Sequence, residues 1–145
     1  MTQIERSAVV GYTPRQMFEL VNHVADYPRF LPWCRSGRVL RESETEVEAC
    51  LEIAWSGLHK SFTTRNTLHM PDRIDIRLVS GPFRRLAGHW QFQAVGETGC
   101  RVSLALEFEL AGHFFDRLFQ PVFYRIANSL VDAFCKRAAE IYGAS

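Results

Sequence analysis

Between residues 38 and 110, apolar and polar side chains alternate with a period of two, which is the pattern of antiparallel strands that bury one face. The alternation is most regular where Leu104 and Leu106 are flanked by Ser103 and Glu107. Residues typical of turns interrupt it at Ser56-Gly57, Pro71-Asp72, Gly81-Pro82 and Gly96 to Gly99. Together with a further stretch at the start of the chain, the pattern predicts about seven strands.

That first strand, predicted over residues 4–10, is followed by signals for two short helices. Thr13 suits the N-cap of one helix, and Pro14 suits its first helical position. Pro28 and Pro32 restrict the second helix to a short piece, because proline lacks a backbone donor and disfavours helical geometry in the residue before it.

After Gly112 the period becomes helical and stays so to Tyr142, with apolar residues about 3.7 positions apart on average. These residues are Phe115, Phe119, Phe123, Ile126, Leu130, Phe134, Ala138 and Ile141. Pro121 lies inside the helix, where it predicts a kink or a break into two pieces. Gly143 is the expected stop signal.

A sheet with one apolar face needs a cover, and the C-terminal helix is the long apolar helix that the pattern offers. The predicted fold class is therefore α+β, a curved antiparallel sheet wrapped around that helix. By parity the inner surface is rich in large rings: Trp33, Trp55, Phe62, Trp90, Phe92, Phe108, Phe115, Phe119 and Phe123. Such rings either fill a core or frame a ligand cavity, and periodicity alone does not separate the two.

Composition narrows the class of protein. With 145 residues, 47% of them hydrophobic, the chain fits a single soluble domain over residues 1–145. A formal net charge of +1 provides no global field that would recruit nucleic acid, so we expect no DNA partner. Any anionic partner must meet a local patch.

The cysteines and the N-terminus point to the cytoplasm. The four cysteines are far apart, so we expect free, mostly buried thiols and neither a disulfide framework nor a metal site. An apolar signal segment is absent from the first residues, and no apolar run reaches the ~18 residues of a membrane span. Peripheral contact with the inner face of a membrane remains compatible with this location.

Several motifs together resemble the coenzyme Q-binding START-like family, within the polyketide cyclase/START superfamily, and especially its branch of bacterial ribosome-association toxins. The resemblance covers essentially the whole chain. It is carried by the segments at residues 9–14, 17–22, 26–34, 61–66 and 81–86 and by Ala133-Phe134. Among them, the segment Asp-Tyr-Pro-Arg-Phe-Leu-Pro-Trp-Cys at residues 26–34 is the longest.

The resemblance implies a helix-grip fold, in agreement with the order of elements read from the pattern. It also implies binding of ubiquinone or a similar isoprenoid lipid in a groove under the long helix, in support of respiration. For the toxin branch it implies association with the large ribosomal subunit that hinders joining of the subunits. Fold transfers more safely than function, so both functions stay open at this point.

For the lipid site, the expected lining combines inward aromatic and aliphatic residues with a few polar groups. The candidates are Trp33, Phe62, Thr64, Asn66, Trp90, Phe92, Leu106, Phe115, Phe119 and Phe123. The hydrophobic effect alone can hold an isoprenoid tail, whereas Thr64 or Asn66 would orient a quinone carbonyl. The alternative for Asn66 is a buried amide with a purely structural role.

Two surface features are further candidates. A basic patch facing ribosomal RNA would combine Arg29, Arg35, Arg38, Arg41, Arg84 and Arg85, and the alternative is an ordinary solvated surface. The segment from Tyr27 to Trp33 and the turn at Gly81-Pro82-Phe83 would present Phe30 and Phe83 at the mouth of the groove, to admit lipid or touch a bilayer. The alternative there is loop packing.

Catalysis is the third hypothesis, because related helix-grip proteins include cyclases. It requires titratable groups that converge in a pocket. The five histidines are scattered along the chain, and Arg125, Asn128 and Asp132 share a helical face opposite the apolar stripe. We therefore expect a non-enzyme with no cofactor or metal, whose bound ligand is ubiquinone-like.

Overall fold

The computed structural model describes residues 2–112 and 114–143, without the side chains of residues 114–117. Its strands are β1 (Thr2–Val10), β2 (Cys34–Glu42), β3 (Glu46–Trp55), β4 (Leu58–His69), β5 (Arg73–Ser80), β6 (Phe83–Val95) and β7 (Gly99–Leu110). Its helices are α1 (Pro14–Asn22), the 3-10 helix η1 (Val24–Arg29) and α2 (Phe114–Tyr142). The expected order of elements is confirmed.

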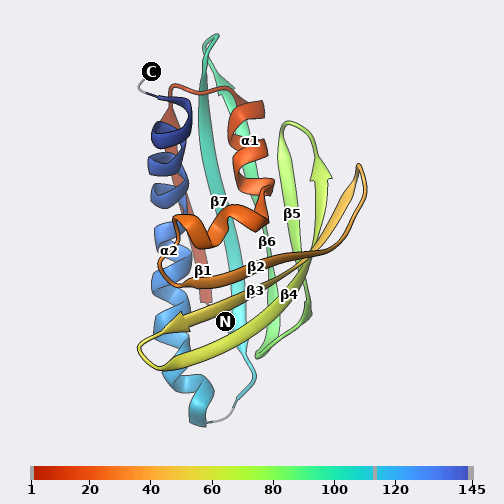
Figure 1. The fold of residues 1–145 in the computed structure, drawn as a ribbon, viewed down its shortest axis with the longest axis vertical. Helices are drawn as coiled ribbons and strands as arrows, with labels where there is room; N and C mark the ends of the chain where they lie inside the picture. Colours follow the sequence, from red (N-terminus) through yellow and green to blue (C-terminus); the bar gives the residue numbers. More distant parts are fainter. Residues whose placement is uncertain (1, 113, 144–145) are drawn as a thin grey trace.

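The seven strands form one antiparallel sheet in the order β1-β7-β6-β5-β4-β3-β2. Figure 1 shows how this sheet curves, with β2, β3 and β4 crossing in front of the long β6 and β7 while α2 runs along the side of β1. α1 and η1 lie on the same side of the sheet as α2. We call this side the inner face and the opposite side the outer face. The helix-grip architecture is thus confirmed.

The predicted alternation places side chains as expected on the longest strands. On β7, Val102, Leu104, Leu106 and Phe108 are buried, whereas the residues between them are half-buried. The turn after β5 brings the backbone close to β4, since a Cβ on Gly81 would lie 2.6 Å from the Cβ of Phe62. Gly81 also has a φ of +150°, a conformation that side-chain-bearing residues rarely adopt.

The start of α1 is fixed by its cap. The hydroxyl of Thr13 accepts a hydrogen bond from the backbone N–H of Gln16 at 3.1 Å, and the side chain of Gln16 accepts one from the backbone N–H of Thr13 at 2.9 Å. This capping box satisfies two of the donors that a helix start leaves open. It sets the direction in which α1 buries Met17 and Phe18.

Two expectations about the C-terminal helix, the break at Pro121 and the burial of Ile141, are wrong, while the kink at Pro121 stays a prediction. α2 is one helix of 29 residues, so Pro121 does not break it into two pieces. The reason lies in the packing on either side of the proline: Phe119 and Phe123 are both buried, with ring centroids 5.8 Å apart. Ile141, expected on the buried stripe, is 46% exposed, and the residue of the last turn that packs inward is Tyr142, whose ring centroid lies 5.7 Å from that of Tyr12.

Among the described residues, the helices lack the combination of length and apolar character that a membrane-spanning helix requires. The four cysteines are free, as expected. Cys34 and Cys100 are buried, and Cys50 and Cys135 are half-buried.

Candidate functional site

A cavity of about 90 Å³ lies between the inner face of the sheet and α2. Its walls come from α1, η1 and the loop after it, from strands β3 to β7, and from α2. The lining residues are Val21, Val24, Tyr27, Trp33, Ala49, Leu51, Phe62, Thr64, Asn66, Ile74, Ile76, Leu86, Trp90, Leu106, Phe123, Ile126, Leu130 and Phe134. The inner surface is therefore packed over most of its area and hollow at this place.

Seven of the ten predicted site residues line this cavity: Trp33, Phe62, Thr64, Asn66, Trp90, Leu106 and Phe123. The structure brings them together from the loop after η1, from β4, β6 and β7, and from α2. Their role in binding stays a prediction, because proximity to the cavity does not identify a ligand.

Phe92 and Phe119 are buried but do not line the cavity. Phe92 lies further along β6, where its ring packs against Phe18 of α1 at 5.8 Å between centroids. Phe119 packs against Phe83 at 6.1 Å and closes the core below the cavity. The period of a strand or a helix predicts the face of a side chain but not its position along the element, so it did not separate Phe92 on β6 and Phe119 on α2 from the residues that line the cavity. Phe115 lies outside the described side chains.

Several lining residues were not singled out from the sequence as site residues. Two helices, α1 and η1, contribute Val21, Val24 and Tyr27. The proline and capping signals in the sequence predicted where these helices lie in the chain, but not which of their faces points to the sheet. Ile126 and Phe134 belong to the apolar stripe of the long helix, so the helical period of the sequence could have identified them as lining residues. Contacts between segments far apart in the sequence decide which part of the stripe faces the cavity.

Three polar side chains line the cavity apart from the two tryptophans. The hydroxyl of Thr64 donates a hydrogen bond to Oδ1 of Asn66 at 3.1 Å. The hydroxyl of Tyr27 donates to the backbone carbonyl of Val21. Burial raises the pKa of Tyr27 well above its ordinary value, with a smaller contribution from Cys34, so the phenol stays neutral. Among the described lining residues, Tyr27 is the one titratable group.

An aromatic cluster closes the end of the cavity near the start of α2. Phe83 lies at its centre, with ring centroids 5.6 Å from Phe62 and 4.8 Å from Phe123. Because Phe83 is only 6% exposed, the expectation that it lies open at the mouth of the groove is wrong. Phe83 is the first residue of β6. The turn at Gly81 directs this strand back under α2, so the ring of Phe83 points inward.

Phe30 also packs within the protein instead of lying free. Its ring centroid lies 5.3 Å from that of Phe134 and 6.1 Å from that of Tyr27. The guanidinium of Arg137 lies 5.1 Å above the same ring, within the range of a cation–π contact. Phe30 remains half-buried at the edge of this cluster, so of the two phenylalanines expected at the entrance it is the one that retains access to solvent.

The six arginines of the expected basic patch do not form one surface. Arg29 pairs with Asp26 at 3.5 Å, and Arg85 pairs with Glu107 at 2.8 Å. Arg35 lies 3.9 Å from Glu52. The remaining three, Arg38, Arg41 and Arg84, have no ion pair with another described residue. Strands β3, β4 and β5 separate Arg84 on β6 from the pair on β2.

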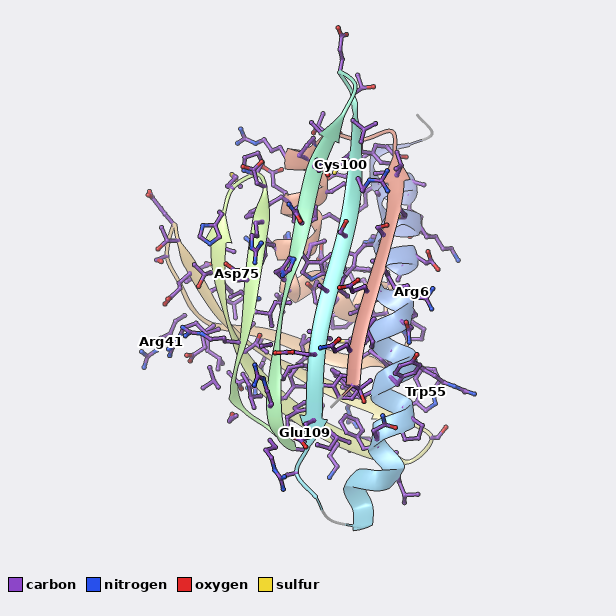
Figure 2. All side chains as sticks on the ribbon, turned by 180° about the vertical axis from the view of Figure 1, so that it is seen from behind. Arg6, Arg41, Trp55, Asp75, Cys100 and Glu109 are labelled. Atoms are coloured by element: carbon purple, nitrogen blue, oxygen red, sulfur yellow. The ribbon has the colours of Figure 1, made fainter. Side chains whose placement is uncertain are left out.

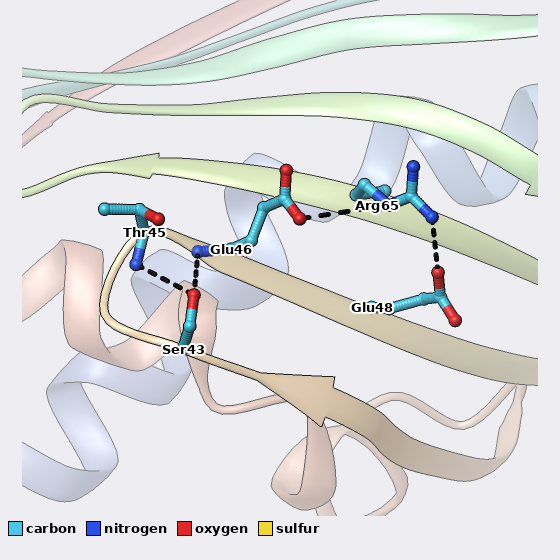
Figure 3. A network of polar contacts seen from close by, with 5 residues as sticks. All are labelled: Ser43, Thr45, Glu46, Glu48 and Arg65. Carbon is cyan, nitrogen blue, oxygen red and sulfur yellow. Dashed lines mark hydrogen bonds and ion pairs between the residues drawn. The ribbon is translucent and has the colours of Figure 1, made fainter.

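The outer face of the sheet is polar and extensively paired. Figure 3 shows Arg65 between two carboxylates of β3, with Glu48 at 3.0 Å and Glu46 at 4.0 Å. Ser43 accepts hydrogen bonds from the backbone of Thr45 and Glu46 in the adjoining turn. In Figure 2 the labelled Arg41 projects from the edge of the sheet that lies opposite α2 in this view.

The helical face with Arg125, Asn128 and Asp132 lies away from the cavity. Oδ1 of Asn128 accepts a hydrogen bond from Nε of Arg6 on β1 at 2.9 Å, which fixes α2 to the sheet edge. Arg125 and Asp132 are exposed. This helical face therefore contacts β1 through Asn128 and places none of these three side chains in the cavity.

Comparisons with known proteins place this geometry in a wider group. The sequence profile of the family described as "Polyketide cyclase / dehydrase and lipid transport" matches residues 10–135. A ribosome association toxin RatA from Pseudomonas aeruginosa is 46% identical over 142 residues, which cover 98% of this chain and 99% of the relative. The mitochondrial coenzyme Q-binding protein of Schizosaccharomyces pombe is 24% identical over 91% of this chain and 84% of its own length.

Solved structures agree on the fold. A solution structure of an 18 kDa protein from Caulobacter crescentus is 33% identical and superposes with a TM-score of 0.75 over 99% of this chain and 100% of the other. The Zhui aromatase/cyclase of a Streptomyces species has a TM-score of 0.83 over 99% of both chains, at 16% identity. At that identity the second similarity concerns the fold alone.

Proposed function

The chain belongs to the polyketide cyclase/dehydrase and lipid transport family, and from this premise we propose that it binds an apolar isoprenoid ligand of the ubiquinone type in the cavity under α2. The observation that carries the proposal is the lining: fifteen of the eighteen residues around the cavity are aliphatic or carbon-rich aromatic side chains, and Tyr27, Thr64 and Asn66 are the others. A distant relative named as coenzyme Q-binding supports the ligand class.

Ligand binding of this kind requires the cavity to expand. Its volume of about 90 Å³ is smaller than the ~150 Å³ of an engineered apolar cavity that holds benzene. Burying one five-carbon isoprene unit contributes roughly 3–4 kcal/mol, at about 0.8 kcal/mol for each CH₂-sized group. The free energy gained by burying the ligand must offset the cost of displacing rings such as those of Phe62 and Phe123, which close one end of the cavity.

The test is a titration of delipidated protein with a short-chain ubiquinone, followed by tryptophan fluorescence. Trp33 and Trp90 line the cavity, so we expect saturable quenching. Ala49→Phe fills the space from β3 and should abolish saturation, whereas Ala94→Phe, on an exposed position of β6, should not. Equal quenching of both variants, or quenching that never saturates, would contradict the proposal.

We propose binding and not catalysis as the task of the cavity. General acid or base work needs titratable groups near a substrate, and here Tyr27 is held neutral by burial with its proton donated to Val21. The similar proteins named above include both association or binding proteins and a cyclase. The chemistry of the lining favours the former.

Ribosome association is a second candidate, favoured by the 46% identical relative that carries this function in its name. On this chain we propose the exposed strand β2, where Arg38 and Arg41 flank exposed Val39 and Leu40, as the surface that meets the phosphates of the large subunit. Cosedimentation with large subunits should decrease for Arg38→Glu with Arg41→Glu, and at raised salt. Arg35→Gln, on the same strand but next to Glu52, is the matched control.

We also propose a cytoplasmic location with transient contact at the membrane, which would give the protein access to a lipid ligand of this class. The side chains of α2 that suit such contact are Leu118, 51% exposed, and Tyr124, 44% exposed. Vesicle flotation of the Leu118→Ser variant checks this part, and unchanged flotation relative to the unsubstituted protein would contradict it.

A further inference from the structure

We propose that Phe30 and Arg137 form the gate through which a ligand reaches the cavity, at the seam between η1 and α2. The ring of Phe30 covers this seam, and the guanidinium of Arg137 holds the ring in the closed position. The inference rests on the proposed apolar-ligand function and adds the route of entry and the residues that control its rate.

The cavity wall at this seam is built from two rings. Tyr27 of η1 and Phe134 of α2 both line the cavity, and their ring centroids lie 5.3 Å apart. Phe30 packs edge-on against both, at 6.1 Å from Tyr27 and 5.3 Å from Phe134. Tyr27 and Phe134 are buried, whereas Phe30 is half-buried. The ring of Phe30 is therefore the layer between solvent and this part of the wall.

Arg137 stacks over the ring of Phe30. Its guanidinium carbon lies 5.1 Å from the ring centroid, within cation–π range, and its side chain is 20% exposed. The carboxylate that pairs with it, Glu140, lies 3.5 Å away and is itself largely in solvent. Nε of Arg137 is buried and has no hydrogen-bond acceptor among the described residues. An unpaired buried donor disfavours the closed position, and water satisfies this donor once the side chain swings outward, so the gate is held only moderately.

The opposite end of the cavity is closed by more extensive packing. Among the described residues there, Phe62, Phe83 and Phe123 are all buried and pack against one another. Opening that end would expose several rings at once. Phe30, in contrast, follows the last residue of η1, so its side chain can rotate without breaking a helix. One side chain and its cation therefore control the seam between η1 and α2.

The experiment measures the rates of ligand entry and exit by stopped-flow quenching of tryptophan fluorescence, with delipidated protein and a short-chain ubiquinone as the probe. Phe30→Ala removes the cover and should raise both rates about tenfold. The Kd should change by less than about threefold, because Phe30 covers the route without lining the cavity. Arg137→Gln should raise both rates about twofold to fivefold, as expected for one partly exposed cation–π contact. Arg125→Gln, on the exposed face of α2 away from the cavity, is the matched control and should leave both rates unchanged.

A double variant tests whether the ring and the cation act as one unit. In that case Arg137→Gln adds no further acceleration to Phe30→Ala, because the cation then has no ring to hold. Independent, multiplicative increases in the two rates would show that Arg137 acts elsewhere and would overturn its role in the gate.

Unchanged rates in both single variants, with saturable binding intact, would overturn the gate and leave the proposed function standing. A higher Kd that comes from faster exit alone would overturn it as well, since Phe30 would then belong to the binding surface. Absence of saturable quenching in the unsubstituted protein would overturn both proposals. If Phe30→Ala does not fold, as judged by circular dichroism, Arg137→Gln carries the test, and rates equal to those of Arg125→Gln contradict the inference.

Discussion

The same strands make the two faces of this sheet, but apolar packing stabilises the inner face and ion pairs connect side chains on the outer face. On the inner face of β7, Val102, Leu104 and Phe108 are almost completely removed from water. On the outer face, ion pairs such as Arg65 with Glu48 at 3.0 Å and Arg73 with Asp75 at 2.7 Å remain partly in solvent. The difference indicates that stability depends mainly on the inner face, which also holds the proposed ligand cavity, while the ion pairs of the outer face stay partly hydrated.

The largest effect should follow from opening a hole in the inner face away from the cavity. Phe108 is 1% exposed and its ring lies 4.7 Å from that of Phe123, between centroids. We expect Phe108→Ala to lower the free energy of unfolding by about 3–5 kcal/mol, because the removed ring leaves an unfilled space. Urea unfolding measures this, and a loss below about 1 kcal/mol would show that the inner face is not closely packed there.

Alkaline pH should weaken the same face next. Burial raises the pKa of Cys100 from its ordinary value near 9 to about 11 and, together with Glu52, raises that of Cys34 to about 11. A thiol whose pKa is raised in the folded state stabilises that state fully below its unfolded pKa, and the contribution disappears as the pH rises from about 9 to about 11. We expect a decrease of roughly 1–3 kcal/mol in this window.

The matched control for that window is the double variant Cys34→Ala with Cys100→Ala. Its unfolding free energy should change less between pH 9 and pH 11, because the buried thiols no longer ionise. Tyr27 keeps a raised pKa in both proteins, so a shared decrease at the upper end of the range is expected. Parallel curves for the two proteins across the whole range would contradict the role assigned to the thiols.

A smaller effect tests the outer face. The pair between Arg65 and Glu48 has exposed fractions of 42% and 16% for its two side chains. A double-mutant cycle with Arg65→Ala and Glu48→Ala should give a coupling energy of about 0.2–1 kcal/mol, as for other solvated pairs. A coupling above about 2 kcal/mol would mean that this face contributes to stability as strongly as the inner one.

The sequence predicted the faces far better than it predicted the site. Period two along β7 and the helical period of α2 assign each side chain to a face, which sufficed for the fold and for seven of the ten cavity residues. The same rule placed Phe92 and Phe119 at the cavity wrongly, because their distance from the hollow depends on how α1 and α2 pack. Phe83 was likewise expected at the surface, because the inward path of its turn is a tertiary feature.

The smallest effect concerns Asp75 on the outer face, at the position labelled in Figure 2. Partial burial by itself raises the pKa of this carboxyl, but hydrogen bonds from Arg73 and His69 outweigh that effect and lower it below 3.8. Stability from such a group is present above its unfolded pKa and is lost as the pH falls through the folded pKa. Because the side chain is 38% exposed, solvent screening limits the contribution to a few tenths of a kcal/mol, on the order of other surface pairs.

The free energy of unfolding of Asp75→Asn should therefore differ slightly from that of the unsubstituted protein at pH 7 and converge with it near pH 3. A difference that grew toward acid pH would reverse the sign of this linkage and refute the assignment.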